Sequence, residues 1–287
     1  NKSMIQLAKD DPEIITQLGI IDNTPLDFHS GKLASYTEAQ DQKTLKKLQQ
    51  IRTGLDKYGP DGLEGQELLS WKIAAWFFDD LLRQTSLDPY GYRVTQLSGV
   101  ATDIPQLLTD SHVIKNEKSV KRYIARVNEF GRVLSEVKTR LEEDREKGVV
   151  PPDFILEKSI GVMEAFIEGG VEENPLVTTL PAKLDDIEGL SAEKHEAFLT
   201  QTKEAVATKV IPGYEAMIAV YEDMLKTANH DAGIWRLPNG DKQYEVALKS
   251  FTTTDMTAEE IHAVGLSEVD RITAEMDQIL INQGITD

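Results

Sequence analysis

Cysteine is absent from this 287-residue chain, and so are long apolar runs. Without cysteine the protein forms no disulfide and has no thiolate metal site or thiol nucleophile. Its longest apolar runs, such as residues 73–78 and 216–221, are far shorter than the roughly twenty residues that a membrane-spanning helix needs. We therefore expect no transmembrane segment.

Basic residues are also scarce, with 31 lysines and arginines against 49 aspartates and glutamates. The net charge of -18 repels the phosphates of nucleic acids and the head groups of anionic lipids, so we expect no nucleic-acid partner. Hydrophobic residues still make up 40% of the chain, which is enough for a folded protein with a substantial core. At this length we expect one large domain or two ordinary ones.

Apolar residues recur at helical spacing through most of the chain. One such stripe follows Thr37 and contains Leu45, Leu48, Ile51 and Leu55. No segment alternates between apolar and polar residues in the way that a half-buried strand does. The sequence therefore predicts an all-α fold, a multi-helix array with long, partly kinked helices and at most one or two very short strands.

One kink is predicted within residues 191–228, where Pro212 and Gly213 lie in the middle of a helical pattern. Proline there removes a backbone hydrogen bond and crowds the preceding turn, which gives either a kinked helix or two abutting ones. The two strand candidates are residues 233–237 and 250–254, because both are rich in residues that suit a pleated surface.

Two helices carry apolar stripes that we expect to be buried. The first stripe is bulky and aromatic, and its residues are Leu69, Ile73, Trp76, Phe77 and Leu81. The second belongs to the last helix, and its residues are Ile261, Val264, Val269, Ile272, Met276 and Ile279. Thr257 is the expected start of that last helix, since Glu260 three residues later completes a capping box.

No self-sufficient catalytic motif is present. A zinc-binding HExxH helix needs two histidines one turn apart, but the candidate His195–Glu196 is followed by Leu199 at the second histidine position. The other histidines each lack a second histidine at helical spacing; they are His29, His112, His230 and His262. We therefore assign no catalytic residue and no metal ligand from the sequence.

Four residues near the C-terminus are candidates for substrate binding: Tyr244, Thr252, Thr253 and Thr254. Extended threonines can present hydroxyl and amide groups to a peptide, as edge strands do. The alternative is that the three threonines bond their own backbone beside a helix cap, as such hydroxyls often do.

Three stretches, residues 92–108, 123–160 and 233–276, together resemble a bacterial family, domain of unknown function 885. The most specific part reads TTTDMTAEEIHAVGLSEV, from Thr252 to Val269, and the resemblance extends from about Pro12 onward. It implies a zinc-dependent, peptidase-like protein of the gluzincin type, similar in helical architecture to the carboxypeptidase Taq group. The family's zinc motif follows the region matched here, so zinc is implied for a full-length parent and for no residue of this chain.

The resemblance also implies an organisation and a location. Residues 1–287 would be the N-terminal helical portion of a larger peptidase-like domain, with residues 1–230 as a helical body and 231–287 leading into a missing zinc-binding half. The expected partners are that C-terminal half and a peptide substrate. The expected location is the cell envelope or periplasm, with a lipid anchor, and otherwise the cytoplasm.

The alternative function is a non-catalytic helical binding or scaffold protein of the cell envelope. The last helix distinguishes the two interpretations. An exposed apolar stripe on this helix favours the portion of a larger enzyme, because a core cut in two leaves an apolar surface. A buried stripe favours the self-sufficient scaffold.

Overall fold

The structure is a computed structural model that describes residues 9–87 and 91–285. These residues contain helices and turns but no strand, which confirms the predicted all-α array. The chain divides into two compact units, Asn1–Pro238 and Asn239–Asp287. None of the described helices is both long and apolar enough to cross a membrane.

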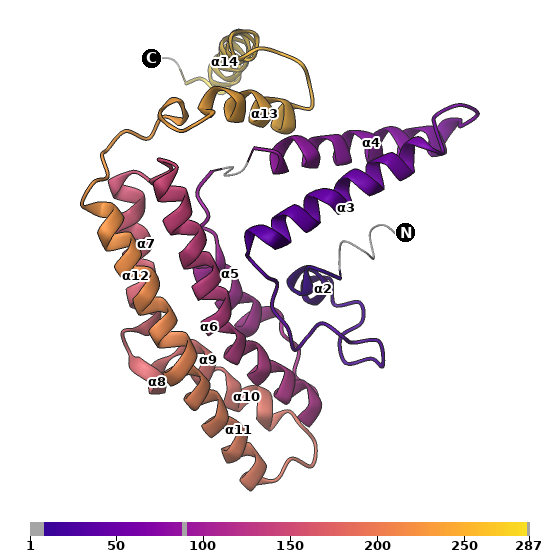
Figure 1. Cartoon of the computed structure of the whole chain (residues 1–287). Coiled ribbons are helices and arrows are strands. Elements are labelled where there is room, and N and C mark those ends of the chain that lie inside the picture. The colour runs from indigo at the N-terminus through magenta and orange to yellow at the C-terminus, as the bar shows by residue number, and fades with distance from the viewer. Residues whose placement is uncertain (1–8, 88–90, 286–287) are drawn as a thin grey trace. The chain divides into compact units, whose positions relative to one another are not determined.

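The first unit holds most of the helices (Figure 1). Its longer helices are α2 (Pro12–Leu18), α3 (Glu38–Asp56), α4 (Gly65–Thr85), α5 (Val100–Gln106), α6 (Glu117–Glu146), α7 (Asp153–Ile167), α11 (Ala192–Ala205) and α12 (Ile211–Leu225). Three short helices join α7 to α11, and they are α8 (Gly170–Glu173), α9 (Pro175–Thr178) and α10 (Leu180–Asp185). The second unit contains α13 (Gly240–Thr252) and α14 (Ala258–Asn282).

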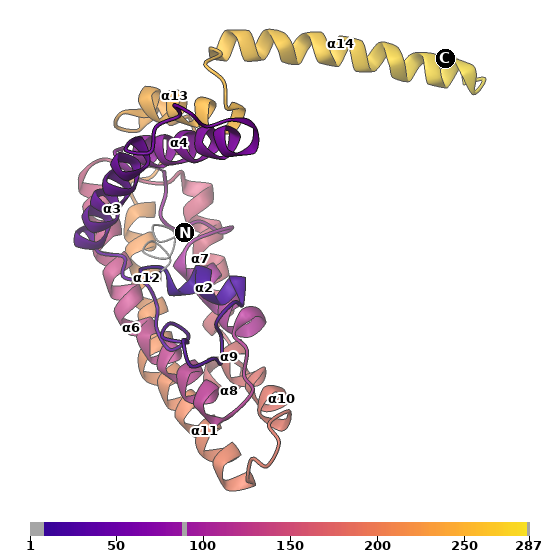
Figure 2. The same cartoon turned by 90° about the vertical axis from the view of Figure 1, so that its right-hand side faces the viewer.

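Helix α6 is the centre of the first unit. Asn116 begins it with a capping box, in which the Asn116 side chain accepts from the Ser119 backbone N–H at 3.0 Å. Its apolar stripe is almost fully buried and includes Val120, Tyr123, Val127, Phe130, Leu134, Val137 and Leu141. Helix α12 packs against both α6 and α7, so the three form the main bundle (Figures 1 and 2).

The predicted kink at Pro212 takes a specific form. Helix α11 runs into one π-helical turn, Val206–Val210, and α12 follows it directly. Pro212 therefore lies in the first turn of α12, directly after the π-helical turn, where it has no N–H to donate to the preceding turn. A second π-helical turn, Leu107–Ser111, comes after a proline instead of before it, namely Pro105 of α5.

Buried Arg126 attaches the N-terminal segment to α6. It is 0% exposed, and its Nε donates to Lys32 O at 2.9 Å while Nη2 donates to Thr16 Oγ1 at 2.7 Å. Nη1 lies 3.1 Å from Nδ1 of His112. Because a guanidinium only donates, His112 Nδ1 accepts, and the ring proton is on Nε2, which faces Ser119 O at 3.4 Å.

Both strand candidates were wrong. Residues 234–236 form a short 3₁₀ turn, and residues 250–252 are the last turn of α13. Thr253 then ends α13 in the left-handed region, with φ of 55°, so the threonines are not extended. Strand propensity there was overridden by the helix that starts at Gly240.

The predicted burial of the α4 aromatic stripe was only partly right, because Trp76 and Leu81 are half-buried but the other three residues are exposed. The side of α4 that carries the other three residues faces solvent: Leu69 is 50% exposed, Ile73 58% and Phe77 43%. Helix α4 instead packs on α3 through the opposite side, where Phe78 contacts Leu48 and Ile51 in a small separate core. Periodicity locates a stripe on a helix but does not state which neighbour covers it.

Gly213 provides a test of the α6–α12 packing. A Cβ added at Gly213 would lie 2.6 Å from Cδ1 of buried Leu134, so Gly213→Ala should destabilise the protein by about 1–2 kcal/mol despite better helix propensity. Gly161 is the matched control, because it is in α7 with no atom near its added Cβ. Gly161→Ala should stabilise by about 0.5–1 kcal/mol in urea unfolding. Equal effects of the two substitutions would contradict this packing.

Acid should weaken the His112–Arg126 contact. Burial, with Arg126 as the second cause, lowers the pKa of His112 to about 3, well below its ordinary 6.5. The neutral ring therefore stabilises the fold above about pH 6.5, and this stabilisation is lost as pH falls towards 3, by at most about 1.4 kcal/mol per pH unit. Urea unfolding at pH 7.5 and 5.0 measures the loss.

The control variants separate His112 from other groups. His112→Gln should reduce the pH dependence without abolishing it, because burial also lowers the pKa of His29. His230→Gln replaces an imidazole whose side chain is 82% exposed, and it is the surface control measured beside His112→Gln. The assignment fails if His112→Gln has the pH dependence of the unsubstituted protein.

Candidate functional site

A groove lies between α13 and the start of α14, within the second unit. Asn239, with φ of 58°, starts α13, and a short turn after Thr253 leads to α14. Thr257 caps α14 as predicted: its Oγ1 accepts from the Glu260 N–H at 3.2 Å, and Glu260 Oε2 accepts from the Thr257 N–H at 2.8 Å. The start of α13 and the capping box of α14 thus fix the two helices that form the sides of the groove.

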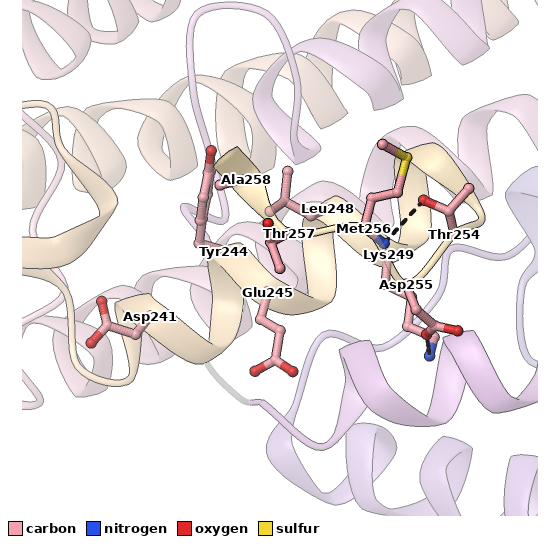
Figure 3. Close-up of a pocket in the computed structure, with 10 residues that line it drawn as sticks. All are labelled: Asp241, Tyr244, Glu245, Leu248, Lys249, Thr254, Asp255, Met256, Thr257 and Ala258. Carbon is pink, nitrogen blue, oxygen red and sulfur yellow. Dashed lines mark hydrogen bonds and ion pairs between the residues drawn. The ribbon is translucent and has the colours of Figure 1, made fainter. Parts of the chain in front are cut away.

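The groove has a volume of about 470 Å³ and is open to solvent. Figure 3 shows its lining residues, which are Asp241, Tyr244, Glu245, Leu248, Lys249, Thr254, Asp255, Met256, Thr257 and Ala258. Three of these are acidic and one is basic, and the basic Lys249 is ion-paired with Asp255. The groove is therefore partly apolar and carries negative charge.

The structure brings together two of the four predicted substrate-binding residues. Tyr244, which is 46% exposed, and Thr254 line the groove, whereas Thr252 and Thr253 do not. Thr252 Oγ1 donates to Leu248 O at 2.8 Å and lies 2.9 Å from Thr254 Oγ1. The Thr252 hydroxyl thus has the local bonding considered as the alternative, and the substrate-binding role of these residues remains a prediction.

A second group of polar residues was not recognised from the sequence. His29 lies in the loop after α2, fully buried between two carboxylates: Nε2 is 2.8 Å from Asp22 Oδ1, and Nδ1 is 3.3 Å from Asp27 Oδ1. Asp27 is also paired with Arg122 of α6. Searching only for pairs of histidines missed this group, because its other members are nearby aspartates in a loop.

Neither histidine candidate fits the catalytic zinc centre that the family resemblance implies. Such a centre needs an open ligand position that substrate can reach, whereas the His29 side chain is 0% exposed. His195 has Asp185 at 3.4 Å, but Leu199 occupies the place of a second histidine one turn on. No catalytic step through zinc is therefore assigned to this chain.

The apolar stripe on α14 is exposed, contrary to the expectation that it is buried. Figure 2 shows most of α14 clear of α13. Val264 is 51% exposed, Val269 61% and Ile272 46%, and Met276 and Ile279 are similarly open. The apolar side chains of this stripe are therefore left uncovered by the described residues.

Two substitutions separate a ligand-binding role from a structural one in the groove. Tyr244→Ala should weaken binding to an immobilised peptide array by about tenfold or more while leaving unfolding unchanged, because the ring is half exposed. Thr252→Val should leave peptide binding unaltered but destabilise α13 by about 0.5–1.5 kcal/mol, because its hydroxyl bonds locally. If Tyr244→Ala leaves peptide binding unchanged, Tyr244 is not part of the binding site.

Comparison with known proteins agrees with this architecture. A crystal structure of "the putative lipoprotein from Colwellia psychrerythraea" superimposes with a TM-score of 0.81 at 22% identity, over 99% of this chain and 52% of that one. The chain thus spans about half the length of this solved structure, which at this identity shows a shared fold. No curated protein matches the chain significantly. The family model for "Bacterial protein of unknown function (DUF885)" matches residues 12–286, nearly the whole chain, so this match does not support the expected missing C-terminal half, and the chain belongs to the bacterial family of unknown function 885.

Proposed function

We propose that this chain is the helical, substrate-binding portion of a larger peptidase-like protein of the bacterial envelope. In this proposal the groove beside α13 contacts peptide, and the metal chemistry belongs to another portion of the protein. The envelope location follows the description of the Colwellia protein as a lipoprotein. The peptidase activity follows the family resemblance set out from the sequence.

The observation that carries the proposal is the exposed stripe on α14. Helix α14 has 25 residues, and none of them is buried. An isolated helix of this kind gains little stability in water, since helices in proteins depend on the packing of their apolar face. We infer that α14 packs on further protein in the functional molecule. The match to 52% of the Colwellia protein is consistent with such additional protein.

The groove residues support binding rather than catalysis. Tyr244, Leu248 and Met256 offer apolar contact, and Asp241 and Glu245 attract a positive charge. The groove has no histidine among its lining residues, and the hydroxyls of Thr254 and Thr257 accept from the backbone N–H groups of Met256 and Glu260. We therefore assign recognition to this groove and no bond cleavage.

A second candidate function is a non-catalytic binding protein of the envelope. The groove favours it in one respect, because all of its lining residues lie within the unit Asn239–Asp287 and need no other portion of the protein. The two functions predict different masses and metal contents for the protein made in its native host.

The product made in the native host should be heavier than the 32.1 kDa of this chain and should carry about one zinc. Intact-mass spectrometry and elemental analysis of that product measure both quantities. The 287-residue chain, assayed beside it, should not hydrolyse a mixed peptide library. A native product of 32.1 kDa without zinc would favour the binding protein, and hydrolysis by the 287-residue chain would contradict the assignment.

A further inference from the structure

The apolar stripe on α14 has the spacing of a contact between two helices. Its central residues recur at intervals of three and four, the a and d positions of a heptad repeat, and therefore lie in one row along the helix. All of them are exposed, and they are Val269, Ile272, Met276 and Ile279. Leu266 and Leu280, at neighbouring e positions, are exposed as well and widen the row. A row of about two heptads fits one partner helix that packs through an apolar row of its own.

Carboxylates border this row on both sides. Glu268 and Glu275 occupy g positions along one edge, and Asp270 and Asp277 occupy b positions along the other. Helix α14 contains six acidic residues but only one basic residue, Arg271, which pairs with Glu268 and Glu275 of its own helix. Asp270 and Asp277 make no ion pair with a described residue. The exposed row therefore lies between two acidic edges.

The negative charge decides between possible partners of α14. Helices that lie on membranes carry lysine and arginine on their polar face, which bind anionic lipids, and α14 has the opposite charge. A second copy of α14 is disfavoured too, because two such acidic helices would repel each other. The partner that complements α14 is a protein surface with an apolar row and basic borders.

We propose that the apolar stripe on α14 binds an apolar helix bordered by lysines or arginines. In keeping with the proposed function, on which this assignment rests, the partner helix belongs to another portion of the same protein. The two apolar rows lose their contact with water, while the basic borders lie against the two glutamates on one edge and the two aspartates on the other. Opposite charges at such borders select the partner and its orientation, whereas the apolar row supplies most of the affinity.

Two synthetic helical peptides test the charge requirement on the 287-residue chain. Both have 25 residues, the length of α14, with leucine at the a and d positions of each heptad. One has lysine at the e and g positions, and the other has glutamate there. In fluorescence anisotropy the lysine-bordered peptide should bind at least about tenfold more tightly than the glutamate-bordered one, and added salt should reduce the difference.

A pair of substitutions distinguishes binding at the row from general attraction between opposite charges. Ile272→Asp should weaken binding of the lysine-bordered peptide at least about tenfold, because it places a carboxylate within the row. Ala274→Asp is the matched control and should not weaken it, because Ala274 is exposed on the opposite side of the same helix. Neither position is buried, so the first unit should keep its fold in both variants.

Charge reversal in the protein isolated from its native host tests the contact in place. Asp270→Lys combined with Asp277→Lys should speed amide exchange of α14 at least about tenfold, because two basic borders would then repel each other. Exchange of α6 should be unchanged, which shows that the variant is folded. Ala274→Lys is the control and should leave the exchange of α14 as it is in the unsubstituted protein.

Any of five results would overturn the docking surface. They are equal binding of the two peptides, equal effects of Ile272→Asp and Ala274→Asp, unchanged exchange of α14 after charge reversal, a dimer of the 287-residue chain that Ile272→Asp dissociates, and binding to phosphatidylglycerol vesicles that Ile272→Asp abolishes. If the native product is nevertheless heavier than 32.1 kDa and holds zinc, the docking surface fails and the proposed function stands. A native product of 32.1 kDa without zinc would instead contradict the proposed function.

Discussion

The guanidinium of Arg126 is the group on which the N-terminal part of the first unit depends. It is fully buried, and its hydrogen-bond partners among the described residues are carbonyl oxygens, a hydroxyl and a neutral imidazole. Burial lowers the pKa of Arg126 only to about 10, so the group stays charged and must keep every acceptor it has. Those acceptors come from α2, the loop that follows it, and His112. Because α2 and its loop lie about a hundred residues before Arg126 in the sequence, a single side chain of α6 holds distant segments together.

Tyrosine hydroxyls repeat this arrangement elsewhere in the main bundle. Tyr123, Tyr214 and Tyr221 each donate to a backbone carbonyl at 2.7 Å, and those carbonyls belong to Leu176, Ala101 and Val94. Each bond satisfies a buried hydroxyl and fixes a short helix or loop on α6 or α12. The bundle around α6 is therefore complete, whereas α4 and α14 present apolar rows to solvent. That contrast is the physical basis for the proposal that α14 packs on further protein, since an ordinary monomer covers such rows.

Local signals predicted much of this structure. The cap at Thr257 starts α14 as expected, because a cap depends on residues three or four positions away. The burial of the α4 and α14 stripes was mispredicted, because burial depends on distant parts of the protein. The groove could be predicted only in part. Tyr244 and Thr254 both line it because the chain turns at Thr253, whose backbone is in the left-handed region. The cluster around His29 needs a loop conformation that no periodicity encodes.

Amide hydrogen exchange along α14 tests the central claim most directly. It should be measured by mass spectrometry on the 287-residue chain and on the protein isolated from its native host. Because no residue of α14 is buried, its amides should exchange rapidly in the 287-residue chain and at least about 100-fold more slowly in the native protein, where its apolar stripe is covered. Protection of α14 in the 287-residue chain equal to that of α6 would contradict the account.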